Sequence, residues 1–131
     1  MEPKVTVEQL SARRDTAPQS WRVKWRVRNL GREPLELLAA RLPHSKFRGE
    51  EQELMPHLKL LANQSADIEL AVACGERPGT MVENAFLIFR AFWRERSWRI
   101  FCRLTAAFDE RGAPRTTTEL ITAQPVGWHQ Q

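Results

Sequence analysis

Tyrosine is absent from this chain of 131 residues, and cysteine is scarce. Without tyrosine, no phenolic group can serve in acid or base chemistry. Cys74 and Cys102 could form at most one disulfide, and neither belongs to a Cys-x-x-Cys pair of the kind found in redox and zinc sites. We therefore expect both thiols to be reduced and structural.

Sequence motifs of enzymes are also missing. The chain has no Gly-x-Ser-x-Gly segment, no phosphate-binding glycine-rich loop and no His-Glu-x-x-His segment. The histidines His44, His57 and His129 fall in expected loops or the tail, without the spacing of metal ligands. Cys74 lies beside Gly75 in an expected turn, which makes it the more exposed thiol and the one candidate nucleophile. The sequence thus predicts a protein that is not an enzyme and needs no metal or cofactor.

Long hydrophobic runs are lacking as well. Ala85–Phe89 is among the longest, and no purely apolar run exceeds five residues, whereas a membrane-spanning helix needs about 20. The N-terminal Met-Glu-Pro-Lys has neither the basic head nor the apolar stretch of a secretory signal. We expect a cytoplasmic protein with no membrane partner.

The composition is that of one folded domain. Hydrophobic residues make up 42% and charged residues 27% of the chain, as in ordinary globular proteins. A length of 131 residues is sufficient to bury a core without disulfides. The net charge of +4 permits an acidic partner but does not require one.

The most informative segment is residues 21–28, which read Trp-Arg-Val-Lys-Trp-Arg-Val-Arg. Strict alternation of apolar and cationic side chains predicts a strand with one buried face. Further strands are expected at 4–10, 35–42, 67–72, 84–94 and 97–108, while 44–64 fits either a short helical turn or an edge strand. These strands, with glycine and proline turns between them, predict an immunoglobulin-like antiparallel β-sandwich of about seven strands over 1–114. Residues 115–131 are expected to be an edge strand or a partly ordered tail.

A family resemblance supports this fold. The segment Asn29-Leu30-Gly31-Arg32-Glu33-Pro34 resembles the bacterial immunoglobulin-like modules in which a strand ends in Asn-x-Gly and a proline opens the next strand. Asn63-Gln64-Ser65, followed by the alternation of Ile68, Leu70 and Val72, is similar to the same group. The resemblance implies an adhesive or interaction domain, because such modules commonly have that role in larger exported proteins.

The cationic row Arg22, Lys24, Arg26 and Arg28 has two interpretations. Four positive charges on alternate residues could meet successive phosphates of a nucleic acid. In a sandwich, however, this strand lies between 4–10 and 67–72, whose outward residues include Glu8, Asp67 and Glu69. Cross-strand pairing with these carboxylates is the favoured interpretation.

The two strands 84–94 and 97–108 have apolar residues on both faces. If Leu87 and Ile100 point inward, the outward surface consists of Phe86, Ile88, Arg90, Phe92, Arg99, Phe101 and Arg103. Such a surface needs a cover, which could come from 44–64, from the C-terminal tail or from another subunit.

Aromatic side chains interleaved with arginine are typical of protein interfaces. We therefore expect a protein-interaction or assembly module whose partner is a protein, with self-association into a homodimer as one form. The alternative is a nucleic-acid-binding domain in which exposed rings stack on bases and arginines hold phosphates. Trp128 could be a docking point for a partner or belong to a disordered end.

Overall fold

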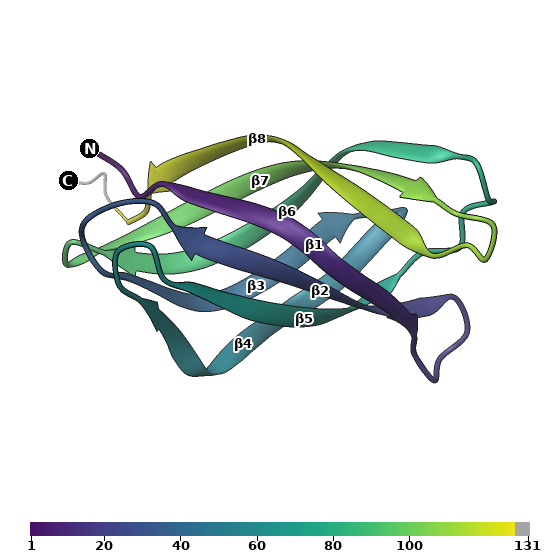
Figure 1. The fold of residues 1–131 in the computed structure, drawn as a ribbon, viewed down its shortest axis with the longest axis horizontal. Helices are drawn as coiled ribbons and strands as arrows, with labels where there is room; N and C mark the ends of the chain where they lie inside the picture. Colours follow the sequence, from purple (N-terminus) through teal and green to yellow (C-terminus); the bar gives the residue numbers. More distant parts are fainter. Residues whose placement is uncertain (128–131) are drawn as a thin grey trace.

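Eight antiparallel strands make up most of the protein, for which a computed structural model describes residues 1–127 (Figure 1). The strands are β1 Val5–Arg14, β2 Ser20–Asn29, β3 Leu35–His44, β4 Phe47–Leu60, β5 Ser65–Ala73, β6 Met81–Trp93, β7 Arg96–Phe108 and β8 Pro114–Pro125. They form one sheet in the order β1-β2-β5-β4-β3-β6-β7-β8. Within the described residues, no helix has the length and apolar character needed to cross a membrane.

Alternate side chains of each strand fill the interior, as a period of two predicts. In β2, the apolar residues Trp21, Val23, Trp25 and Val27 are at most 2% exposed. The inward rows expected for β6 and β7 are confirmed: the core includes Leu87, Phe89, Ala91, Trp93, Trp98, Ile100, Cys102 and Leu104. The all-β antiparallel class is therefore correct.

The expected two-sheet sandwich of seven strands is wrong. The eight strands form a single, nearly closed, barrel-like sheet, because β4 joins what would have been two separate sheets. It pairs along β3 on one side and with β5 at Arg48↔Ala73 on the other. At the far end of the order, β8 extends the sheet by pairing with β7 from Phe108↔Pro114 to Trp98↔Pro125. The predicted neighbours of β2 are nevertheless correct, since β2 lies between β1 and β5.

Side chains link β1 and β8, the two end strands. The amide of Gln9 donates from Nε2 to the carbonyl oxygen of Pro114 at 3.0 Å, and its Oε1 accepts the backbone N–H of Thr116 at 2.7 Å. The Thr118 hydroxyl donates to the carbonyl oxygen of Val7 at 2.8 Å. These bonds replace the backbone ladder that would close the sheet completely.

The segment 44–64, which was the hardest to interpret, is mostly strand. Of the two alternatives for it, the helical turn is wrong, because Phe47–Leu60 forms β4. The expected strand is present, but it is not an edge strand, since β4 lies between β3 and β5 in the sheet. Its pairing with β3 jumps from Leu37↔Leu58 to Ala39↔Glu53, so residues 54–57 leave the ladder. The strand bends sharply at this excursion (Figure 1). No regular period survives such an interruption, which explains why the pattern was unclear.

Candidate interaction surface

The candidate surface is the outer side of β6 and β7, where the structure places all seven predicted residues. Alternate residues of these strands lie in the core, so the residues between them point outward. Pairing across the two strands sets Phe86 opposite Arg103, Ile88 opposite Phe101 and Arg90 opposite Arg99. The seven residues thus form one continuous two-strand surface, extended at one end by Phe92.

The centre of this surface is apolar. The rings of Phe86 and Phe101 meet edge to face with centroids 6.5 Å apart. Ile88 lies outside the main core and is only 7% exposed. Phe92 is 40% exposed, and Leu120 of β8, opposite Arg103, is 51% exposed. We call the set Phe86, Ile88, Phe92, Phe101 and Leu120 the apolar patch.

Leu120 was missed by the sequence analysis. It belongs to residues 115–131, which were expected to form an edge strand or a partly ordered tail, with no face assigned to any of these residues. A bulge between Arg103 and Leu104 shifts the register of β7 against β8, which turns Leu120 to the outer face. The signal that could have found it is a leucine within a run rich in threonine at the end of the chain.

Carboxylates on β4 border the patch on the β3 side. Arg90 forms ion pairs with Glu51, at 3.4 Å, and with Glu53. Arg41, which is opposite Ile88, also lies 3.9 Å from Glu51. This part of the surface is close to neutral, a pairing that sequence analysis could not predict because the excursion in β4 sets its register.

The β8 side of the surface is different. Among residues 1–127, neither Arg99 nor Arg103 forms an ion pair, and neither do Glu83 and Glu119. Arg103, Glu83 and Glu119 nonetheless line one open depression of about 410 Å³. Unpaired charges of both signs therefore lie next to the apolar patch.

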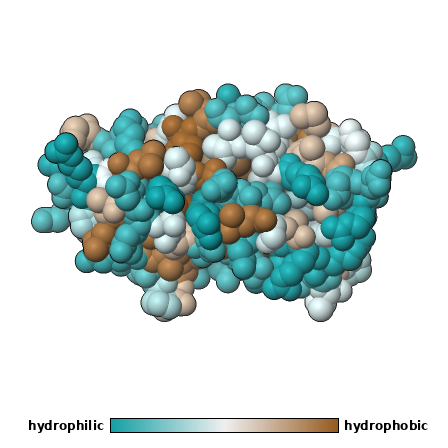
Figure 2. Space-filling model, in the orientation of Figure 1, coloured by the Kyte–Doolittle hydropathy of each residue, from teal (hydrophilic) through white to brown (hydrophobic). Residues whose placement is uncertain are grey.

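In the described part of the chain, neither of the two segments expected to cover the outer side of β6 and β7 lies over it. Both segments expected to cover it lie within the sheet: β4 pairs beside β3, and β8 pairs beside β7. No segment within 1–127 forms a second layer over the apolar patch. Figure 2 shows the side that carries β1, β2, β5 and β8, where hydrophobic patches are scattered over a largely hydrophilic surface.

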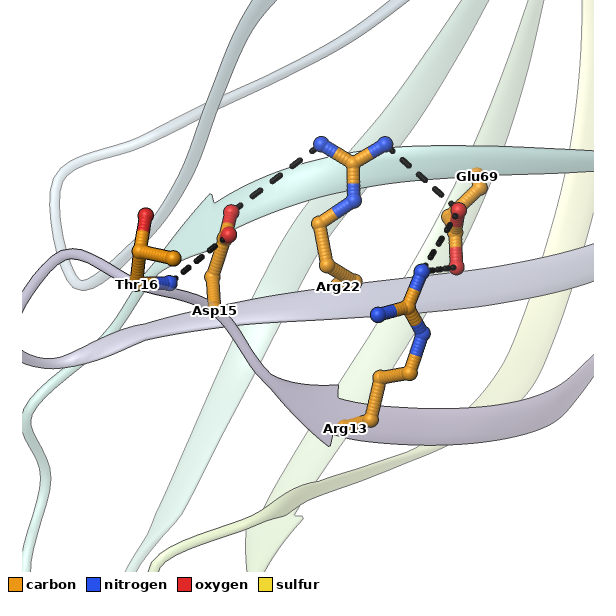
Figure 3. A network of polar contacts seen from close by, with 5 residues as sticks. All are labelled: Arg13, Asp15, Thr16, Arg22 and Glu69. Atoms are coloured by element: carbon orange, nitrogen blue, oxygen red, sulfur yellow. Dashed lines mark hydrogen bonds and ion pairs between the residues drawn. The ribbon is translucent and has the colours of Figure 1, made fainter.

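The cationic row on β2 is partly neutralised, as the favoured interpretation predicted. Arg26 meets Asp67 at 2.9 Å, and this ion pair and hydrogen bond lower the pKa of the Asp67 carboxyl. Arg22 lies between Asp15, at 4.0 Å, and Glu69, at 3.5 Å (Figure 3). Glu69 also accepts a second guanidinium, that of Arg13, at 3.3 Å.

The rest of the row is more exposed to solvent. Arg28 donates to the backbone carbonyl of Asn63 at 3.3 Å. Lys24 pairs in register with Glu69 of β5, without an ion pair among the described residues. Half of the row is thus already engaged with carboxylates of the chain itself, which weakens its use as a phosphate-binding strip.

Neither cysteine has the environment of a nucleophile. Cys74 is the more exposed thiol, as expected, but both side chains are buried, with exposed fractions of 6% for Cys74 and 0% for Cys102. Burial raises the pKa of both thiols to about 11, for Cys74 with a further contribution from Glu76. At neutral pH both are therefore protonated and unreactive, and both are free.

Two of the three histidines lie in strands, where loops were expected. His44 ends β3, and His57 lies in β4 between Glu36 and Glu53, at 3.5 and 3.7 Å. His129 and the proposed docking residue Trp128 lie outside the described residues. Across 1–127, no group of three or more histidine, cysteine or carboxylate side chains has the arrangement of a metal site.

Comparison with known protein families and with curated proteins gave no match for this sequence. The proposed function therefore rests on the geometry of the surface.

Proposed function

We propose that this chain is a protein-interaction module that binds a second copy of itself through the outer face of β6, β7 and β8. The observation that carries the proposal is the apolar patch, which no other segment of 1–127 covers. Aromatic rings beside arginines are the composition that protein interfaces favour, because rigid rings bury large areas at low entropic cost.

Charge supports a second copy as the partner. A two-fold interface brings the same surface together twice, so a surface carrying both signs next to its apolar centre can complement itself. Arg103 on β7 and Glu119 on β8 provide both signs without an ion pair in the described chain. In a two-fold dimer, each guanidinium can meet a carboxylate of the other copy.

A double variant, Phe92→Asp with Phe101→Asp, tests the proposal. Two carboxylates in the apolar patch should abolish self-association, because burying an unpaired charge at an interface is strongly unfavourable. Sedimentation equilibrium measures the dimer constant, and circular dichroism verifies the fold. The matched control is Leu10→Asp with Leu61→Asp, at two residues 39% and 48% exposed on other strands and loops.

Because Phe101 is half-buried, Leu120→Asp provides a second variant at a 51% exposed position. It should weaken the dimer by about 10-fold or more, since hot-spot positions at interfaces contribute about 1–2 kcal/mol or more each. Unchanged association in both patch variants would refute the proposal.

The alternative function, nucleic-acid binding, makes a different prediction. Arg99 and Arg103 next to Phe101 could hold phosphates while the ring stacks on a base. Affinity for an oligonucleotide would then fall steeply with salt, whereas an apolar protein interface is much less sensitive. Nucleic-acid binding is the second choice, because Arg22 and Arg26 on β2 already pair with carboxylates of the chain itself.

A further inference from the structure

A second unfilled feature lies between β4 and β5, on other strands than the apolar patch. Within the described chain, these two neighbours share one pair, Arg48↔Ala73. The Ala71 carbonyl oxygen still approaches Gly49 closely, at 3.2 Å from where a Cβ would lie. Beyond that point β4 turns away toward its excursion at 54–57 and leaves the edge of β5 without a neighbour (Figure 1).

The register identifies the peptide groups that are left free. The N–H of Asn29 donates to the Gln64 oxygen and that of Cys74 to the Gln19 oxygen, both at 2.9 Å. In an antiparallel ladder, hydrogen-bonded pairs alternate along the strand. Every second residue of β5 between these two bonds therefore bonds to β2, namely Ala66, Ile68, Leu70 and Val72.

The residues between them direct their N–H and C=O groups the other way, toward β4. Near the Arg48↔Ala73 pair these groups have a neighbour. At Ser65, Asp67 and Glu69, no strand of 1–127 pairs with this edge. Such a row of unpaired backbone groups is a template for an added strand.

An open cleft of about 480 Å³ lies along this edge. Its lining residues are Gln52, Glu53, Leu54, Met55, Pro56, Leu58, Asp67, Ile68 and Glu69. The lining itself is apolar and acidic, with three carboxylates and no basic residue. Each of these carboxylates also pairs with at least one arginine outside the lining. At the rim, Met55 is 78% exposed.

We propose that this cleft binds an extended peptide segment with alternating basic and apolar side chains, which adds as a strand to the free edge of β5. The chemistry of the occupant follows from β5 itself. Its outward residues Asp67 and Glu69 already accept arginines of β1 and β2, and an added strand would share these carboxylates. Ile68, between them, points to the opposite face and belongs to the core.

The other edge of β5 already holds a strand of this pattern. β2 alternates cationic and apolar residues, with Arg26 on Asp67 at 2.9 Å and Arg22 on Glu69 at 3.5 Å. Glu69 accepts Arg13 as well, so a carboxylate on this sheet can serve cations from more than one strand (Figure 3). An added strand with the same alternation would repeat this arrangement on the free side.

The test uses an end-blocked peptide of about ten residues, the length of a typical strand, with arginine and valine in alternation. A block peptide of the same composition, all arginines first and all valines last, is the control. Fluorescence anisotropy should show the alternating peptide binding about tenfold more tightly, since only its register places cations and apolar groups on opposite faces.

Hydrogen exchange identifies the edge. Binding should slow exchange at the amides of Ser65, Asp67 and Glu69, and leave those of Ile68 and Leu70 unchanged, because β2 already protects them. Equal affinity for the two peptides, or slowed exchange at strands other than β4 and β5, would overturn the proposal. Protection of the same three amides by a rise in protein concentration alone would also overturn it, since the occupant would then be a second copy.

A pair of variants tests the role of charge. Gln52→Lys adds a cation to the cleft lining and should weaken peptide binding about two- to fivefold, the effect of one exposed charge. Thr117→Lys makes the same charge change on β8 and should leave binding unaltered. The variant Phe92→Asp with Phe101→Asp should bind the peptide normally, so failure of self-association and failure of peptide binding are separate results.

Discussion

Asn29 is the single buried polar side chain in the described part of the chain, and it links two connections at one end of the sheet, β2–β3 and β4–β5. Its Nδ2 donates to the carbonyl oxygens of Glu33 and Leu60, at 2.9 and 3.0 Å. Its Oδ1 accepts the N–H of Gly31 at 2.9 Å. The Asn-x-Gly pattern that predicted a turn thus has a physical cause: the side chain satisfies backbone groups that the turn leaves unpaired.

Asn29→Ala should lower the free energy of unfolding by about 2–4 kcal/mol, because buried carbonyl groups would lose their donor. Urea denaturation followed by tryptophan fluorescence measures the change. Gln124→Ala, at an exposed position of β8, is the control and should change stability by less than about 0.5 kcal/mol. An equal effect of the two substitutions would contradict this role for Asn29.

Asp109 organises the turn between β7 and β8. Its Oδ1 accepts the N–H groups of Ala113 and Arg111, each at 2.9 Å, and these bonds lower its pKa below the ordinary 3.8. A lowered pKa in the folded state means that the carboxylate stabilises the fold above about pH 3.8 and loses this contribution as the pH falls through the folded-state pKa.

NMR titration of the Asp109 carboxyl should therefore give a midpoint below 3.8. Asp109→Ala should be less stable than the original chain at neutral pH, and the difference should shrink in acid. A midpoint at or above the ordinary value, or a difference that grows as the pH falls, would show that the two backbone bonds do not form in solution.

At the scale of elements, the closure of the sheet depends on contacts between β1 and β8. The amide of Gln9 acts as a substitute peptide group, with one donor and one acceptor directed at β8. The Thr116 hydroxyl continues the link, since it donates to Gln9 Oε1 at 2.8 Å and accepts the indole N–H of Trp25 at 3.0 Å. This chain of bonds connects the end strands to the core.

Gln9→Leu should destabilise the protein by about 1–3 kcal/mol, because the Thr116 N–H and the Pro114 carbonyl lose their partners. Hydrogen exchange should show faster exchange at β1 and β8 than at β6 and β7. Gln124→Ala again provides the control. Uniform acceleration in all strands, or none, would mean that Gln9 does not hold the two end strands together.

How well each strand could be predicted depends on whether its pattern involves neighbouring residues or residues far apart in the chain. Residues 21–28 predict β2 and its buried face because a strand's alternation is a property of neighbouring residues. The bend in β4 was not predictable, since the excursion at 54–57 depends on pairing with β3, which lies earlier in the chain. The outward surface of β6 and β7 was predictable from alternation, but its neighbours Glu51 and Leu120 required the register of other strands.

At the scale of the whole molecule, strand pairing over long distances decides the architecture. The sequence predicted antiparallel strands and the position of β2 between β1 and β5, but gave two sheets instead of one. The difference rests on a single pair between β4 and β5 and on the Gln9 link between β1 and β8. Neither of these two contacts produces a periodic pattern of residues in the sequence. The alternation of apolar and polar residues within each strand therefore could not predict the closed sheet.

The closed sheet also explains the proposed function. Its interior is filled by buried residues of β1 to β7, with the partly buried Ile121 and Ala123 of β8 packed against them. The outward side of β6, β7 and β8 has no other layer of 1–127 to pack against. Exposed apolar area next to unpaired charges of both signs then favours association with a second copy.

The most direct test of this claim is the mass of the unmodified chain in solution, free of nucleic acid, by size-exclusion chromatography with light scattering across a series of protein and salt concentrations. The account predicts a dimer, close to twice 15.2 kDa, that forms as protein concentration rises and persists at high salt. A monomer at every concentration would contradict it.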